Sequence, residues 1–227
     1  MQRQEKIKQA YEYVGSAAKF YDGMMTYSSI LGKFISRLVW DLNAEKNRQY
    51  VDFTLAGIPE HFSGRLLEIP IGTGCLTLPF YKNFPNADIV CVDYSDKMLK
   101  AAKERTLKLQ LNNINFIKGD IVRLPFEDNS FDIVLTLNGL HVFPDKETAF
   151  SELNRVLKTN GIFCGTCYVN GENCKTDFFI KFLYVNGGFF TPPFDTVESL
   201  IKRLNTFYRD IKIKTTESEA SFICRKI

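Results

Sequence analysis

The sequence lacks the features that would place it in a specialised class of protein. Its 227 residues include only six cysteines, two histidines and one tryptophan, too few for a dense disulfide scaffold. Lys and Arg number 29 against 26 Asp and Glu, so no strong charge indicates nucleic acid as a partner. Apolar runs such as residues 131–137 fall well short of the ~18 residues needed to cross a bilayer. We expect no nucleic-acid partner and no integral membrane contact.

The N-terminal residues are polar and lack the apolar segment of a secretory signal. With scattered cysteines, this favours a reducing cytoplasmic location. Cys164 and Cys167 have redox or metal spacing, but no second cysteine pair or nearby histidine completes a metal site. Both lie in a predicted strand, where residues three apart face opposite sides. We therefore favour buried thiols over a redox pair, and we expect no metal.

The sequence pattern of the chain changes at residue 65. Residues 5–56 contain few helix breakers and predict helices, and six of their apolar residues recur at helical spacing. These form one apolar stripe: Ile30, Leu31, Phe34, Ile35, Leu38 and Val39. We expect residues 1–60 to form an N-terminal helical cap, part of the same domain as residues 61–227.

From residue 65, short β-branched runs alternate with helical segments. The runs are residues 65–69, 88–93, 115–117, 131–137 and 161–169. A helix is predicted over 96–111, with Ser95 as its N-cap, and another over 145–158, ended by Asn160-Gly161. This alternation predicts right-handed crossovers and parallel strands.

The end of the chain has a different pattern. Residues 210–215 and 220–227 predict an antiparallel hairpin joined by the four-residue turn TESE. The expected fold is α/β and Rossmann-like: a doubly wound, mostly parallel seven-stranded sheet with an antiparallel C-terminal hairpin and an N-terminal helical cap.

A glycine turn follows the first predicted strand, in the segment LLEIPIGTG. Gly72 and Gly74 lack a Cβ, so the chain can turn sharply and a ligand can approach its backbone closely. Amide groups at the start of the following helix would favour a phosphate or a carboxylate. A tight turn without a ligand is the alternative.

Polar residues also end the next three strands. Asp93 closes the second strand and can accept hydrogen bonds from both hydroxyls of a ribose. Asp120 follows the third strand, and Asn138-Gly139 follows the fourth. Because the carboxyl ends of parallel strands meet at one edge of the sheet, these residues predict a single nucleotide-binding crevice.

Four segments carry a family resemblance: LLEIPIGTG, CVDYSDKML, GDIVRLPFEDNSFDIVLTLNGLHVF and ELNRVLKTNGIF. In their order and spacing the chain resembles class I S-adenosylmethionine-dependent methyltransferases, particularly the ubiquinone/menaquinone-biosynthesis branch. The resemblance covers residues 65–225. It implies that residues 61–227 bind S-adenosylmethionine as cofactor and transfer its methyl group.

The resemblance also implies which residues bind the cofactor. Gly72, Thr73 and Gly74 would border its methionine portion, with backbone groups of Leu137 and Asn138 near the amino-acid end. Asp93 would bind the ribose. Tyr94 and Met98 would flank the adenine, whose amino group would donate to Asp120 beside the Ile121 backbone. Tyr21 would close over the cofactor, or would be a core aromatic of the cap.

Two positions bear on the alternatives. Pro70 stands where the family has its first motif glycine, which removes an amide donor. Thr77 stands where a nicotinamide dinucleotide protein would need a third glycine or an alanine, so an oxidoreductase is disfavoured.

The acceptor is expected to be a small molecule, hydrophobic or aromatic, bound by a monomer or homodimer. His141 follows the fourth strand and is either a base or acceptor contact or a structural loop residue. Asp145 is expected near the N-cap of the next helix. Residues 176–194, rich in aromatics, form either a lid over an apolar acceptor pocket or a helix packed on the sheet. A cofactor-binding or regulatory domain without catalysis is the alternative function.

Overall fold

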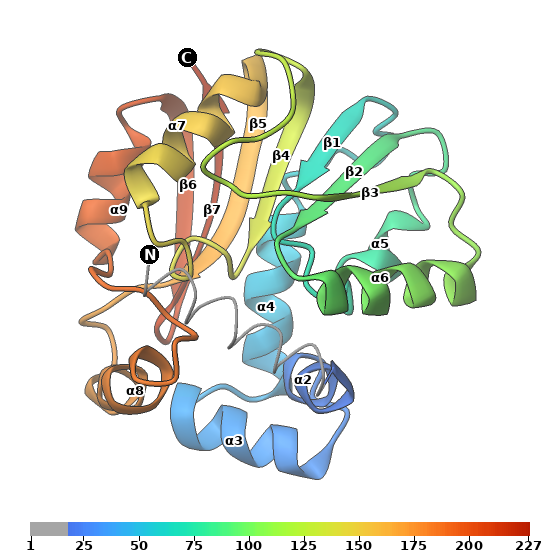
Figure 1. Cartoon of the computed structure of the whole chain (residues 1–227). Helices are drawn as coiled ribbons and strands as arrows, with labels where there is room; N and C mark the ends of the chain where they lie inside the picture. The colour runs from blue at the N-terminus through green and yellow to red at the C-terminus, as the bar shows by residue number, and fades with distance from the viewer. Residues whose placement is uncertain (1–17) are drawn as a thin grey trace.

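A seven-stranded mixed sheet forms the centre of the molecule (Figure 1), as the sequence predicts. The computed structural model describes residues 18–227. The strand order is β3-β2-β1-β4-β5-β7-β6, in which β1 to β5 are parallel and β7 is antiparallel to both β5 and β6. The strands are β1 (Arg65–Glu68), β2 (Asp88–Asp93), β3 (Ile114–Lys118), β4 (Phe131–Leu137), β5 (Leu157–Tyr168), β6 (Tyr208–Thr216) and β7 (Glu219–Lys226).

Strand β1 lies where the strand order reverses. Leu66 is opposite Ile89 of β2 on one side and Ile133 of β4 on the other. A parallel sheet opens a crevice outside the carboxyl end of its strands at such a reversal. The glycine turn that follows β1 therefore enters this crevice.

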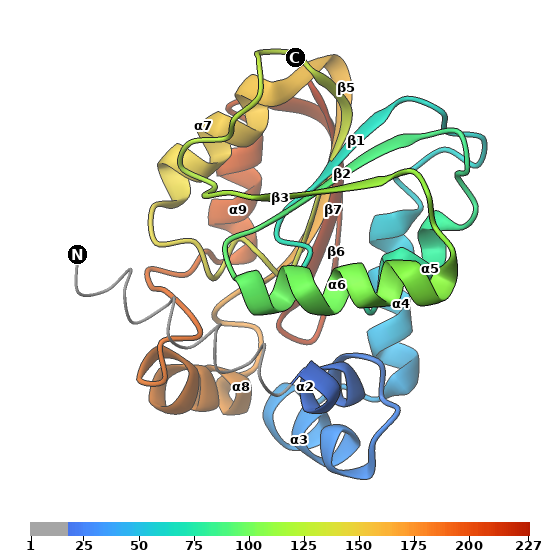
Figure 2. The same ribbon diagram turned by 45° about the vertical axis from the view of Figure 1, so that its right-hand side comes forward.

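Helices cover both faces of the sheet (Figures 1 and 2). Side chains of α4 (Ala44–Leu55), α5 (Leu78–Tyr81) and α6 (Asp96–Leu109) share one buried cluster with Leu66. Side chains of α7 (Lys146–Val156) and α9 (Val197–Leu204) share the other with Leu67. Successive strand residues thus enter opposite halves of the core, as the pleat of a strand requires.

The remaining helices gather beyond the carboxyl ends of the parallel strands (Figures 1 and 2). They are α2 (Ala18–Met25), α3 (Ile30–Trp40), α8 (Cys174–Phe179) and a π-helix, η1 (Ile180–Val185). The helical segment expected over residues 5–56 is thus three separate helices from residue 18 onward. The first part of the expected cap, residues 1–17, lies outside the described residues.

The predicted apolar stripe of α3 is mostly exposed. Ile30 is 88% exposed and Phe34 is 62% exposed, and Leu31 and Leu38 are also exposed, whereas Val39 is buried and Ile35 is half-buried. The cause is the close approach of α3 to α2 through two glycines. A Cβ at Gly32 would lie 2.5 Å from the carbonyl oxygen of Gly23. Small residues therefore make the contact between the two helices, and long side chains point outward.

The helix expected to end at Asn160-Gly161 ends earlier. Asp145 is its N-cap and accepts from the amide of Thr148 at 3.0 Å, but α7 stops at Val156 and Leu157 is already extended. Leu157 pairs with Phe131 of β4, so the chain passes directly from helix into strand. Asn160, at φ 64°, lies inside β5 where its register with β4 shifts.

The C-terminal hairpin is tighter than predicted. Thr216 pairs with Glu219, which leaves the two-residue turn Glu217-Ser218 in place of the four-residue TESE. Glu217 has φ 51°, as tight hairpin turns require. As a result Glu219 belongs to strand β7 and is buried, with 4% of its surface exposed.

Cys164 and Cys167 enter opposite core clusters, as their spacing predicts, and both are free thiols. From residue 18 onward, no helix has the length and apolar character needed to cross a bilayer. The same residues bring together no group of three or more His, Cys, Asp and Glu side chains in a metal-binding arrangement.

Candidate functional site

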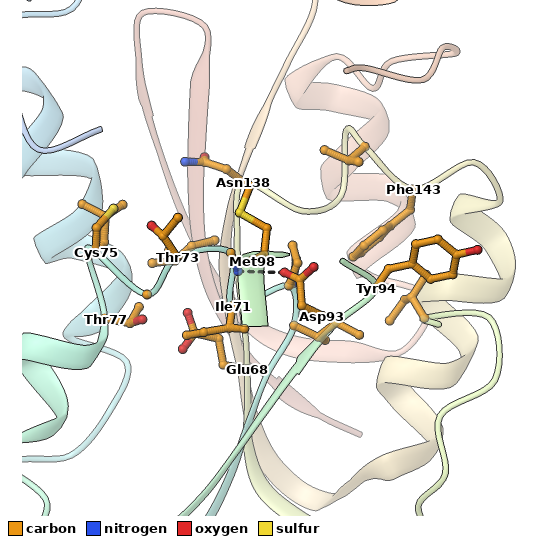
Figure 3. Close-up of a pocket in the computed structure, with 18 of the residues that line it drawn as sticks. Glu68, Ile71, Thr73, Cys75, Thr77, Asp93, Tyr94, Met98, Asn138 and Phe143 are labelled. Carbon is orange, nitrogen blue, oxygen red and sulfur yellow. Dashed lines mark hydrogen bonds between the residues drawn. The ribbon is translucent and has the colours of Figure 1, made fainter. Parts of the chain in front are cut away.

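One cavity at the carboxyl edge of the sheet is lined by every residue that the sequence nominates for the cofactor. We call it the first cavity. These residues come from six parts of the chain: Tyr21 of α2, the loop after β1, the end of β2, the end of β4, the first turn of α6 and the loop after β3. They are Tyr21, Gly72, Thr73, Gly74, Asp93, Tyr94, Met98, Asp120, Ile121, Leu137 and Asn138. Figure 3 labels Thr73, Asp93, Tyr94, Met98 and Asn138 among them.

The glycine turn needs glycine at two positions. Gly72 has φ 57° and Gly74 has φ 65°, in the left-handed region where other residues are strained. A Cβ at Gly72 would meet no atom within 4 Å, whereas one at Gly74 would collide with Leu78. Helix α5 has only four residues and begins at Leu78, so the loop itself, rather than a long helix N-terminus, faces the first cavity.

Asp93 is held at the floor of the first cavity, with 5% of its surface exposed. Its Oδ2 accepts from the amide of Gly72 at 2.8 Å (Figure 3), and its Oδ1 accepts from the amide of Ser95 at 2.9 Å. Because both oxygens accept from backbone amides, the carboxylate is fixed in position at the carboxyl end of β2.

The far wall of the first cavity can hold a flat ring. Tyr94, 44% exposed, and Met98, 1% exposed, follow Asp93 along the chain, and Ser95 caps α6 by accepting from the amide of Met98. The Oδ1 of Asp120 accepts a hydrogen bond from the backbone amide of Val122 at 3.2 Å. These residues fit an adenosyl group: apolar side chains beside a ring and a carboxylate at its edge.

Asn138 follows β4 with φ 56°, and its amide donates to the backbone oxygen of Thr166 at 3.0 Å. Its side-chain oxygen accepts from the Thr166 hydroxyl at 2.8 Å. These two contacts fix the turn after β4. The backbone amide of Asn138 therefore already has a hydrogen-bond partner within the protein.

Glu68, the last residue of β1, also lines the first cavity and was not predicted from the sequence. It is 1% exposed, and its Oε2 accepts from the hydroxyl of Tyr81 at 2.7 Å. Burial raises the pKa of Glu68 to about 8. The signal was present, because an acid that ends a strand at the start of a glycine turn lies at the same sheet edge as Asp93.

Asp22 is a second missed residue, beside Tyr21 on α2. It accepts from the Thr73 hydroxyl and forms an ion pair with Arg105 of α6. Arg105 also donates through Nε to the carbonyl of Thr73 at 3.1 Å. Asp22 thus ties α2 to the glycine turn, a contact between distant segments that no local pattern indicates.

A second cavity adjoins the first and shares Tyr21, Met25 and Asn138 with it. We call it the second cavity. Most of its other lining side chains are aromatic or apolar and come from α2, α3, η1 and the loop after η1: Phe20, Met24, Ile35, Trp40, Leu183, Tyr184, Phe189 and Phe190. The aromatic segment 176–194 therefore supplies part of its wall. Trp40 also donates to the Tyr184 hydroxyl at 3.3 Å, which joins α3 to η1.

His141 lines the second cavity but is a poor candidate for a base. Its Nδ1 accepts from the amide of Tyr168 at 2.9 Å, and its ring lies 4.0 Å from that of Phe190. Burial lowers the pKa of His141 to about 3, so the ring is neutral. With Nδ1 accepting, the proton resides on Nε2, which makes His141 a hydrogen-bond donor.

Comparison with known proteins shows that residues 67–165 match the model of a methyltransferase domain family. Demethylmenaquinone methyltransferase of Staphylococcus aureus is 39% identical over 99 residues, which cover 43% of this chain and 40% of that protein. The match thus spans less than half the length of these curated relatives.

Solved structures support the fold over a larger part of the chain. A possible histamine N-methyltransferase of Thermotoga maritima has a TM-score of 0.69 at 18% identity, covering 97% of this chain and all of that one. Phosphoethanolamine N-methyltransferase 2 of Haemonchus contortus, solved with S-adenosyl-L-methionine, has a TM-score of 0.68 at 19% identity. That alignment covers 91% of this chain and 60% of that one.

Proposed function

We propose that this chain, which carries a class I S-adenosylmethionine-dependent methyltransferase domain, transfers the methyl group of that cofactor to a small aromatic acceptor. The observation that carries the proposal is the pair of adjoining cavities. The first has a fixed carboxylate, Asp93, and the ring-sized wall that an adenosyl group needs. The second is aromatic and shares the walls Tyr21, Met25 and Asn138, where a methyl group would pass between them.

The cofactor supplies the reactive group, a methyl bound to a positively charged sulfur. The task of the protein is to hold donor and acceptor in line and to exclude water. Asp93 and Asp120 would orient the adenosyl group from two strand ends, while the Gly72 turn leaves open space for the methionine portion. Tyr21 would cover the cofactor from the cap, because α2 lies over the turn through the Asp22 contacts.

An aromatic acceptor is supported by the lining of the second cavity and by the curated relatives. Trp40, Tyr184 and Phe190 lie with ring centroids 5.0–5.8 Å apart along one wall. The relatives are called demethylmenaquinone methyltransferases, which is consistent with a quinone-type ring as acceptor. A domain that binds the cofactor without catalysis would not need this second cavity.

The remaining parts of the proposal rest on the sequence. We propose that residues 1–60 act as the cap of the domain formed by residues 61–227, that the protein works in the cytoplasm, and that the acceptor is a small molecule.

Calorimetric titration of the purified protein with S-adenosylhomocysteine, the demethylated cofactor, tests the first half of the proposal. We expect one site per chain and a raised unfolding temperature, with no heat from NAD⁺ as the control ligand. An absence of heat and of any thermal shift with S-adenosylhomocysteine would refute the proposed function.

A further inference from the structure

The second cavity contains one buried acid, Glu219. It is the first residue of β7, opposite Tyr168 of β5. Its neighbours Ala220 and Phe222 belong to the core cluster on the α7 and α9 side, with Ala220 adjacent in the strand and therefore on the other face. The Glu219 side chain consequently points to the α4 side, where it lines the second cavity with 4% of its surface exposed.

Within the part of the chain that the structure describes, nothing compensates the burial of the Oε2 of Glu219. Among residues 18–227, this oxygen has no hydrogen-bond partner, although Glu219 lines the second cavity. The described residues that line the cavity include no Lys or Arg. A buried carboxyl oxygen without a partner is costly, so a ligand that donates a hydrogen bond to it would be stabilised there.

We propose that Glu219 binds the hydroxyl group of a hydroxy-aromatic acceptor in the second cavity and accepts its proton during methyl transfer. The inference rests on the proposed function and names the chemistry of its acceptor. The cavity measures about 330 Å³, roughly twice the ~150 Å³ of an apolar cavity that binds benzene, so two fused rings can enter it. Within the described lining, Glu219 is the one carboxyl group that can receive a proton there.

The proton balance is complete without another reagent. The acceptor O–H bond breaks, its proton passes to the Glu219 carboxylate, and its electron pair forms the new bond to the methyl carbon. The methyl–sulfur bond breaks and its pair stays on sulfur, which leaves the neutral demethylated cofactor. If a ring carbon conjugated with the hydroxyl attacks instead, the balance is the same. That carbon then loses its proton, and a proton returns to the oxygen and restores the hydroxyl. Glu219 afterwards releases its proton to solvent.

The surroundings of Glu219 suit this task. Burial raises the pKa of Glu219 to about 8, so both protonation states are accessible near neutral pH, as an efficient base requires. The other titratable groups on its side of the sheet come from the described neighbouring elements, and none changes charge between about pH 5 and pH 9: Tyr27 after α2, Tyr50 on α4, His141 after β4, Tyr168 on β5 and Tyr184 on η1. Burial holds the pKa of His141 at about 3 and raises the pKa of each of the others.

The test compares Glu219→Gln with Glu217→Gln, a control in the same hairpin whose carboxylate contacts Lys46 instead. The probe acceptor is 1,4-dihydroxynaphthalene under anaerobic conditions, and 1,4-dimethoxynaphthalene is the matched ligand without a hydroxyl proton. Each protein is measured for S-adenosylhomocysteine binding, for probe binding in its presence, and for kcat and KM between pH 5.5 and pH 9.5.

For the parent we expect kcat to rise with pH through an apparent pKa near 8, because the base must be deprotonated to act. Glu219→Gln should lower kcat about 100-fold and remove this dependence, at the low end of what a general base contributes. Its cofactor binding should be unchanged, and Glu217→Gln should match the parent. The parent should bind the dihydroxy probe at least 10-fold more tightly than the dimethoxy ligand.

Two results would overturn the inference: a Glu219→Gln variant that keeps the turnover and pH profile of the parent, or a parent that does not discriminate the two ligands or methylate the dihydroxy probe. In both, intact binding of S-adenosylhomocysteine would leave the proposed function standing. Loss of that binding in the parent would instead refute the proposed function itself.

Discussion

The most direct test of the cofactor site is the substitution Asp93→Asn. In the parent, the two carboxylate oxygens accept from the amides of Gly72 and Ser95, at 2.8 Å and 2.9 Å. An asparagine keeps one oxygen but directs an NH₂ group at one of these N–H donors, so one contact is lost and the side chain carries no charge. Hydrogen bonds to a charged group contribute ~1.5–3 kcal/mol, and removing one from the bound ribose corresponds to about 10–100-fold in affinity.

Isothermal titration with S-adenosylhomocysteine measures this loss, and thermal unfolding without ligand separates it from a loss of fold. Asp88→Asn is the matched control, because Asp88 begins the same strand at its other end, is exposed and pairs with Arg65. We expect the control to bind like the parent. If a folded Asp93→Asn protein bound as tightly as the parent, the assignment of the first cavity to the adenosyl group would be wrong.

Three further substitutions test other contacts. Asp22→Asn should weaken S-adenosylhomocysteine binding about 3–10-fold by titration calorimetry, because a partly buried ion pair to Arg105 and the contact to Thr73 hold α2 over the glycine turn. Ser95→Ala should lower the free energy of unfolding by ~1 kcal/mol in urea, the usual cost of losing an N-cap. Burial raises the pKa of Glu68 from 4.5 to about 8, so Glu68 binds its proton more tightly in the folded protein than in the unfolded chain. Its contribution to the free energy of unfolding is therefore complete below pH 4.5 and is lost as the pH rises to about 8. Glu68→Gln should therefore remove part of the fall in unfolding free energy over this range, ~3–5 kcal/mol at most, measured by urea unfolding at several pH values.

The sequence predicted the sheet and the first cavity because both follow from local patterns. Strands of a doubly wound sheet end at one edge, so Asp93, Asp120 and Asn138 had to converge once the strands were identified. The N-cap role of Ser95 also follows from residues adjacent in the chain. The comparisons confirm the class of the domain over residues 67–165, where these patterns lie.

The sequence could not predict features that depend on contacts between distant segments. The exposed stripe of α3 has the same periodicity as a buried one, and only the approach of Gly32 to Gly23 shows which side is covered. The end of α7 was misplaced because Asn160-Gly161 has the composition of a helix cap but lies in an irregular strand. Glu219 was read as part of a turn for a similar reason, since a shift of two residues in the hairpin decides whether it is solvated or buried.

Helix α2 joins the two cavities, and this arrangement couples ligand binding in one cavity to ligand binding in the other. Tyr21 and Met25 are one turn apart on α2 and line both cavities, while Asp22 between them contacts Thr73 and Arg105 at the glycine turn. A ligand that orders the turn therefore also fixes the shared wall of the second cavity. Acceptor affinity should then depend on cofactor occupancy, and by linkage the two ligands must favour each other equally. Because the Asp22 contacts transmit this coupling, Asp22→Asn should reduce the dependence of acceptor binding on the cofactor more than it reduces acceptor binding by the protein alone.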